Sequence, residues 1–210
     1  MLPLLALIPI IIGGTIVVTA VTGNLLSDRT KDNIRLAKKI AILGTRGTGK
    51  TTLWNSLRGQ SCGGGYRQTV GREEIKEFYL RNGQLKVAST FDIGGGDEDF
   101  MSSYEQVLKG DNIVVFFLVS AVDMMEGNSA IRNSCARLRK ICSTISGKSG
   151  CSLVLFLTHR NDFIRKYGKE SISQVENSAK RTFGEYTNEA CILLELTDRK
   201  DVEQIIKLIR

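Results

Sequence analysis

Residues 43–59 read LGTRGTGKTTLWNSLRG. Within them, the run from Gly44 to Thr51 fits the phosphate-loop pattern Gly-x-x-x-x-Gly-Lys-[Ser/Thr]. Successive backbone N–H groups of such a loop surround an anion at the amino terminus of a helix. The apolar residues 39–43 predict a strand that runs into the loop, and residues 50–57 predict the helix that follows it. A functional phosphate loop requires this order of strand, loop and helix, so the stretch predicts an α/β fold that binds phosphate.

The rest of the chain alternates predicted strands and helices. Asn82-Gly83 is a two-residue hairpin signal, which predicts antiparallel strands over residues 72–80 and 84–93. Further strands are expected over residues 112–120, 152–158 and 190–196, and helices over residues 128–145, 171–183 and 199–209. This alternation predicts a mostly parallel six-stranded sheet with one antiparallel strand and helices on both faces.

Ser146-Gly147-Lys148-Ser149 resembles the end of a second phosphate loop. Cys142 stands where the first glycine of that loop would be, and the pattern predicts no strand before it and no helix after it. We therefore expect these four residues to form a solvated turn.

Composition and charge favour a globular domain that works near phosphates or a membrane. The chain of 210 residues is 42% hydrophobic and 24% charged, with a net charge of +7. The basic residues are not interleaved with aromatic residues in one patch, so we expect no direct binding of nucleic acid. The five cysteines include no Cys-x-x-Cys pair. They argue against a disulfide framework or zinc site and for reduced thiols in a cytosol-facing domain.

The amino-terminal segment predicts a membrane anchor. Residues 1–26 carry no charged side chain and could cross about 30 Å of hydrocarbon as a signal-anchor helix. Residues 27–38 form a basic juxtamembrane linker, which places the domain of residues 39–210 in the cytosol, at the endoplasmic reticulum of a eukaryote or the inner membrane of a bacterium. A signal peptide cleaved after Ala20 would want a basic start, which is absent. A buried core helix would be shorter and amphipathic.

A second motif, Phe91-Asp92-Ile93-Gly94-Gly95, follows the second strand of the predicted hairpin. A carboxylate at that position can hold Mg²⁺ through water. The backbone N–H of Gly95 can face the γ-phosphate of a bound nucleotide. Beside the phosphate loop, this motif indicates a nucleotide site with a metal ion.

Residues 39–210 resemble a small GTPase of the Ras/Arf superfamily, a P-loop NTPase G domain. Asp92-Ile-Gly-Gly is similar to the switch II motif Asp-x-x-Gly, with the double glycine of Arf proteins and heterotrimeric G-protein alpha subunits. Thr69-Val70-Gly71 resembles the switch I Thr-x-Gly. With the anchor, the layout resembles that of the β subunits of signal recognition particle receptors.

The resemblance implies GTP or GDP and Mg²⁺ as ligands, and an effector or receptor protein as partner. It implies a catalytic set of Lys50, Thr69 and Gly95 and a metal set of Thr51, Thr69 and Asp92. The nucleotide-binding set that it implies is Gly44, Thr45, Arg46, Gly47, Thr48, Gly49, Lys50, Thr51, Thr52, His159, Arg160, Asp162 and Leu196.

The base-reading motif of the family, Asn-Lys-x-Asp, has two possible registers here. One places His159-Arg160-Asn161-Asp162 on it, with the Asp162 carboxylate accepting from guanine and the Arg160 stem packing over the base. The other places Thr158 on the Asn and Asn161 on the Asp, which leaves guanine specificity open. In the loop after the last strand, only a backbone contact from Leu196 is expected.

Hydrolysis is expected to be slow. The family has a water-orienting Gln directly after the Asp-x-x-Gly glycine, and this chain has Gly96, which cannot orient water. Asp97 or Glu98 could substitute, or a partner could supply the group. Two alternatives to a GTP-dependent switch are a non-hydrolysing pseudo-GTPase that acts as a docking module and an ATP-using P-loop enzyme.

Overall fold

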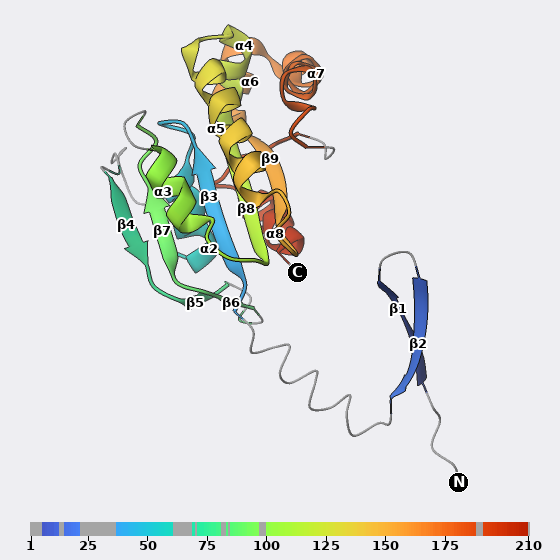
Figure 1. Cartoon of the computed structure of the whole chain (residues 1–210). Helices are drawn as coiled ribbons and strands as arrows, with labels where there is room; N and C mark the ends of the chain where they lie inside the picture. The colour runs from blue at the N-terminus through green and yellow to red at the C-terminus, as the bar shows by residue number, and fades with distance from the viewer. Residues whose placement is uncertain are drawn as a thin grey trace. The chain divides into compact units, whose positions relative to one another are not determined.

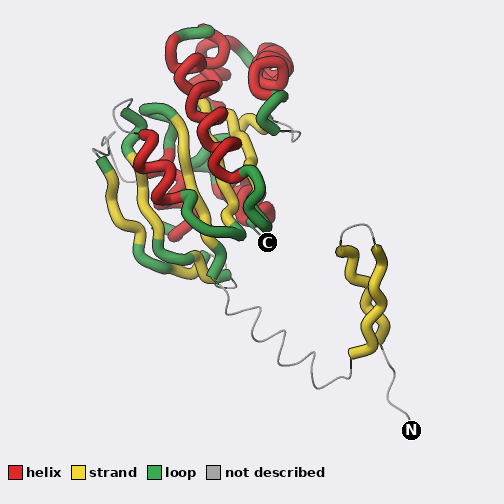
Figure 2. The backbone as a smooth tube through the Cα atoms, in the orientation of Figure 1, coloured by secondary structure: helices red, strands yellow, loops and turns green. Residues whose placement is uncertain are grey.

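The computed structural model describes residues 6–12, 15–21, 37–60, 69, 71–80, 83, 85–96, 100–187 and 191–209. The chain divides into two compact units, Met1–Ala37 and Lys38–Arg210, both drawn in Figures 1 and 2.

In the first unit, β1 (Ala6–Ile12) and β2 (Thr15–Val21) form an antiparallel hairpin. The sequence predicts a helix there, so the described residues differ from that prediction. The local sequence favours this pairing. β-branched residues dominate both strands, and the sequence between them contains Gly-Gly, a dipeptide that is common in hairpin connections. The rest of the predicted anchor and most of the linker lie outside the described residues. Within the described ranges, no helix is long and apolar enough to cross a membrane.

The second unit is an α/β fold around a four-stranded parallel sheet. Its strands are β3 (Lys39–Gly44), β8 (Ile113–Ser120), β9 (Ser152–Thr158) and β10 (Ile192–Leu193), in the order β10-β9-β8-β3. In the register, Gly44 lies opposite Leu118, and Ser120 lies opposite Thr158. The carboxyl ends of the three long strands therefore meet at one edge of the sheet.

The predicted antiparallel pairing is confirmed, although each predicted strand is interrupted. β4 (Arg72–Ile75) pairs with β7 (Thr90–Ile93), and β5 (Phe78–Tyr79) pairs with β6 (Lys86–Val87). Just before β3, Lys38 donates from its N–H to Lys86 O at 2.8 Å and accepts from the N–H of Ala88 at 2.9 Å. The predicted single sheet is thus a four-stranded sheet flanked by two short antiparallel pairs.

Helices cover both faces of the parallel sheet, as Figure 1 shows. One face carries α2 (Lys50–Arg58) and α8 (Arg199–Leu208). The other face carries α3 (Phe100–Val107) and α5 (Ser129–Ile145), with α4 (Ala121–Glu126), α6 (Arg160–Tyr167), the 3₁₀ turn η1 (Lys169–Ser171) and α7 (Ile172–Phe183) beyond them. Helices α2, α5, α7 and α8 agree with the sequence prediction, and α3, α4 and α6 were not predicted. The sequence Ser146-Gly147-Lys148-Ser149 is a turn after α5, as expected.

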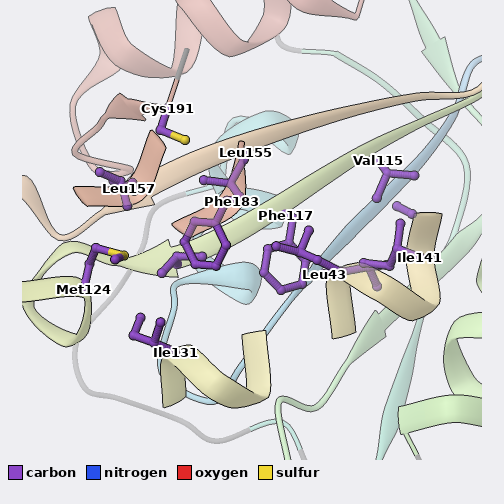
Figure 3. Packing of buried hydrophobic residues seen from close by; sticks show 14 of the residues in the cluster. Leu43, Val115, Phe117, Met124, Ile131, Ile141, Leu155, Leu157, Phe183 and Cys191 are labelled. Carbon is purple, nitrogen blue, oxygen red and sulfur yellow. The ribbon is translucent and has the colours of Figure 1, made fainter. Parts of the chain in front are cut away.

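Two hydrophobic clusters lie on the two faces of the sheet. Side chains alternate between the two faces along each strand. On one face, Leu43 and Phe117 pack with Ile141 of α5. Figure 3 shows these three side chains within this cluster. Phe116, the neighbour of Phe117 in β8, points to the opposite face and packs with Trp54 of α2. Strands buried on both faces account for the continuous apolar runs in the sequence.

Candidate functional site

Residues 44–49 link β3 to α2 at the edge of the sheet where the parallel strands end. Gly49 has a φ of +87°, and a Cβ at this position would lie 2.7 Å from Leu196 Cδ1. Only glycine therefore fits there without strain. Gly49 is also the N-cap of α2 and supplies no side-chain cap. The uncapped amino end of a helix favours an anion, so the nucleotide-binding residues predicted over 44–52 surround a suitable position.

Lys50 is buried within the loop although its side chain carries a charge. It is 6% exposed, and its Nζ donates to Thr45 O at 2.7 Å. Burial lowers the pKa of Lys50 to about 8; the negative charge of Asp92 opposes this shift and the positive charge of Arg137 adds to it. A phosphate group beside Nζ would favour the charged form again.

Thr51, Thr69 and Asp92 converge beside the loop, from α2, the segment before β4, and β7. Thr51 Oγ1 donates to Asp92 Oδ2 at 2.6 Å and lies 3.0 Å from Thr69 Oγ1, and Thr69 Oγ1 donates to Asp92 Oδ2 at 3.3 Å. Burial raises the pKa of the Asp92 carboxyl, partly offset by the Thr51 hydrogen bond and the charge of Lys50. The structure thus brings the three residues of the predicted metal set together.

The donor chemistry of this set fits Mg²⁺, which prefers oxygen ligands. Asp92 is 2% exposed, and its Oδ1 is buried without a hydrogen-bond partner among the described residues. A buried carboxylate oxygen without a partner is costly, and a cation would satisfy it. Among the described residues there is no cluster of three or more His, Cys, Asp or Glu side chains. A cation at Asp92 would therefore also use the hydroxyls of Thr51 and Thr69.

The turn of residues 94–96, after β7, lies directly on the phosphate loop. Gly94 donates from its N–H to Gly71 O at 2.7 Å. A Cβ at Gly95 would lie 2.4 Å from the backbone nitrogen of Arg46, so this close approach also requires glycine. Gly95, predicted to face the terminal phosphate, is therefore at the loop. Asp97 and Glu98 lie outside the described residues.

Arg137 of α5 is a residue of this region that the sequence analysis missed. It is 1% exposed, and its guanidinium donates to Gly95 O at 3.3 Å, to Gly96 O at 2.5 Å and to the hydroxyl of Tyr104 at 3.2 Å. Its position one turn from Ser134 and Ile141, on the apolar face of a predicted helix, indicates that Arg137 is buried but does not indicate its partner. A charged residue on a buried face needs partners, and here the partners are the turn of residues 94–96.

The end of β9 also faces the phosphate loop. Thr158 is buried, and its hydroxyl donates to Thr48 O at 3.0 Å, with Val119 O at 3.3 Å. His159 follows in the left-handed region with a φ of 63°, and its Nε2 lies 2.7 Å from Gly47 O. Thr158 and His159 are therefore the residues of this motif that contact the loop.

Arg160 and Asp162 are occupied by other partners. Arg160 forms ion pairs with Asp198 at 3.2 Å and Asp201 at 2.6 Å, which turns its guanidinium toward the start of α8. Asp162 pairs with Arg165 at 2.7 Å and is half exposed. Two carboxylates hold the Arg160 guanidinium, and the packing of its stem over a base stays a prediction.

The loop after β10 lies behind the phosphate loop. Leu196 packs against Gly49, and its carbonyl accepts a hydrogen bond from Ser56 Oγ at 2.9 Å. Glu195 accepts from the N–H of Asn161 at 3.2 Å. Leu196 and Glu195 thus join the loop after β10 to α2 and α6.

A cavity of about 610 Å³ opens beside these loops. Its walls are formed by Arg46, Gly47, Ser120, Val122, Asp123, His159, Asp162, Arg165 and Lys166. It joins the phosphate loop to the end of β9, so a nucleotide with its phosphates on the loop has open space next to it. We call residues 44–52, Thr69, Asp92 and 94–96 the phosphate half of the site, and residues 158–162 and 194–198 the base half.

The sequence matches no known family model and no curated protein.

Proposed function

We propose that the chain is a membrane-anchored GTP-binding protein that acts as a nucleotide-dependent switch with slow intrinsic hydrolysis. The observation that carries this proposal is the buried Asp92 next to a phosphate loop: its Oδ2 accepts from Thr51 and Thr69, and its Oδ1 has no hydrogen-bond partner among the described residues. We infer further that the second unit is a G domain of the Ras/Arf type, because a parallel sheet whose strand β3 leads into this loop, together with the antiparallel pair of β4 and β7, fits that resemblance.

In this mechanism, Lys50 binds the β- and γ-phosphates, and the amino end of α2 binds the same anion. Thr51, Thr69 and Asp92 would hold Mg²⁺, which supplies positive charge to the phosphate oxygens. The N–H of Gly95 would donate to the terminal phosphate. Thr69 and the 94–96 turn would thus be ordered by a triphosphate, and a protein partner would recognise that ordered state.

Slow hydrolysis of GTP to GDP and phosphate is the expected chemistry. Gly96 has no side chain to orient a water molecule, and its carbonyl already accepts from Arg137. The same observation favours a second candidate function, a pseudo-GTPase that binds nucleotide and docks a partner without turnover. The two differ in one measurement, the release of phosphate under single-turnover conditions.

Guanine is the proposed base, and either Asn161 or Asp162 is the residue that recognises it. The contacts of Thr158 and His159 with the loop support the register that places Asn161 at the reader position. Asp162 lines the cavity and supports the other register. An ATP-using enzyme remains the outcome if neither side chain discriminates.

We further propose that residues 1–26 hold the protein in a membrane, with the second unit in the cytosol. An open two-stranded hairpin cannot lie in hydrocarbon, because its edge N–H and C=O groups have no partners there. Membrane insertion therefore requires these residues to become helical. Circular dichroism of the peptide of residues 1–26 in buffer and in lipid vesicles tests this: no gain of helix in vesicles would contradict it.

The central experiment is a titration of the full-length chain in detergent micelles with fluorescent GTPγS, GDP and ATPγS, with Mg²⁺ or with EDTA. We expect tight binding of the guanine nucleotides that EDTA weakens. Lys50→Met should abolish it, and Lys148→Met, in the similar Gly-Lys-Ser sequence of the turn after α5, should leave it intact. Equal binding of ATPγS would overturn the guanine assignment, and no binding of any nucleotide would overturn the proposal.

A further inference from the structure

Arg137 lies between α5, α3 and the 94–96 turn. Its guanidinium stacks over the ring of Phe100, with 4.5 Å between the guanidinium carbon and the ring centre, and lies 5.8 Å from the ring centre of Tyr104. The Tyr104 hydroxyl, which accepts from Arg137, is also 3.4 Å from the N–H of Gly44. Arg137 is therefore packed between two aromatic rings, and the hydroxyl of one of them reaches the start of the phosphate loop.

The turn of residues 94–96 lies between the Arg137 guanidinium and the phosphate loop. Arg137 donates to the carbonyls of Gly95 and Gly96, and Gly95 packs on the backbone at Arg46. In a trans peptide unit the C=O of one residue points away from the N–H of the next residue, so a fixed Gly95 carbonyl directs the N–H of Gly96 to the opposite side. Arg137 thus holds in place the turn that carries the Gly95 N–H.

Two buried cations lie at this end of the sheet. The charge of Arg137 acts on Lys50 and contributes to the lowered pKa of that ammonium group. Asp92 is the buried carboxylate among the described residues that acts on Lys50. An anion bound at the loop would compensate both cations, and the terminal phosphate is the one nearest the turn.

We propose that Arg137 is a positioning residue that gives the site its preference for a nucleoside triphosphate over a diphosphate. It holds the turn so that the Gly95 N–H meets the terminal phosphate, a contact that a diphosphate does not make. This inference rests on the proposed nucleotide function. The sequence family motifs do not include this residue, and its place on α5 brings it to the site only in the folded chain.

The test compares the affinities for GTPγS and GDP in full-length Arg137→Gln, Arg137→Lys and Leu138→Ala proteins. Leu138 is the next residue of α5 and is fully buried, so its truncation destabilises the same helix without touching the turn. We expect Arg137→Gln to lose about 10- to 100-fold in GTPγS affinity, the range for a lost charged hydrogen bond. GDP affinity should stay within about twofold, and Arg137→Lys should keep part of the preference.

Leu138→Ala should lower the melting temperature and leave the ratio of the two affinities unchanged. Equal losses of GTPγS and GDP in Arg137→Gln, matching those of Leu138→Ala, would reduce Arg137 to a structural role while the proposed function stands. If Arg137→Gln does not fold, Arg137→Lys decides. An unchanged ratio of GTPγS to GDP affinity in this variant, together with unaltered hydrogen exchange at residues 94–96, would overturn the inference. A wild-type chain that binds neither nucleotide would overturn both proposals.

Discussion

The phosphate half and the base half of the site differ in how their charges are satisfied. In the phosphate half, Lys50 is buried beside the charge of Arg137, and Asp92 keeps a buried oxygen without a partner among the described residues. In the base half, Arg160 and Asp162 are already held by ion pairs with their neighbours.

This difference indicates which half of the site a bound ligand would stabilise more. Buried charges without full compensation are costly to the empty protein, and a bound phosphate with its cation would remove that cost. In the base half, the Arg160–Asp201 pair is largely buried and the Asp162–Arg165 pair is half exposed, and a ligand would have to compete with both pairs. The phosphate half is therefore arranged for a ligand, whereas the base half is satisfied without one.

The largest effect is expected from removing the charge of Lys50. Lys50→Met removes the cation that offsets the buried Asp92 carboxylate, so the free energy of unfolding of the nucleotide-free protein should fall by about 3–5 kcal/mol. Urea unfolding without nucleotide measures it, with Lys148→Met as the control. A Lys50→Met protein as stable as wild type would contradict this contrast, because the buried charges of the phosphate half would then carry no electrostatic cost.

Asp92→Asn is expected to raise the Mg²⁺ concentration that gives half-maximal GTPγS binding by about 10- to 100-fold, the range for altered partners at metal sites. The amide removes the charge and keeps the size. A Mg²⁺ titration at fixed GTPγS is the measurement, and Asp111→Asn, at an exposed loop at the other end of β8, is the control. Identical Mg²⁺ curves for Asp92→Asn and wild type would exclude a cation at this carboxylate.

Gly95→Ala should lower GTPγS affinity by about 10-fold and change GDP affinity less, since the added Cβ would lie 2.4 Å from the loop backbone and push the turn away. Gly96→Ala is a matched control, because no atom of the described residues lies within 4 Å of its Cβ position. Equal affinities of the two variants, measured by the same titration, would show that the close approach of the turn has no role in binding.

The smallest effect is expected in the base half. Because Asp162 is paired with Arg165 and half exposed, Asp162→Asn should change the ratio of GTPγS to ATPγS affinity by less than about 5-fold. Asn161→Ala is the companion variant for the other register. A loss of the ratio by about 100-fold in Asp162→Asn alone would identify that carboxylate as the guanine reader and would make the two halves alike.

Long apolar runs made the central sheet predictable, and short elements were not. Strands β3, β8 and β9 are buried on both faces, so the sequence carries them as continuous hydrophobic stretches. Helices α3, α4 and α6 span eight, six and eight residues, too few for a helical period to stand out. In the first unit, an uncharged run rich in Ile and Val satisfies both a helix in lipid and a hairpin, so its pattern alone could not choose.

The phosphate half was predictable because its residues belong to three local motifs, and the structure brings Thr51, Thr69 and Asp92 within hydrogen-bonding distance. Arg137 was not, since its role depends on α5 packing against a turn about forty residues earlier. The ion pairs of Arg160 could not be predicted for the same reason, because Asp198 and Asp201 lie in a distant segment. Contacts between segments far apart in the sequence produce no motif with a fixed spacing.

The parallel pairing of β3 with β8 sets an order of events during synthesis. The loop at the end of β3 is made early, but Gly44 has its strand partner at Leu118, and Thr48 receives its hydrogen bond from Thr158. A ribosome must therefore extend the chain past β9 before the loop has its folded surroundings. A nucleotide could therefore assist only the final stage of folding, long after the uncharged amino-terminal segment has left the ribosome.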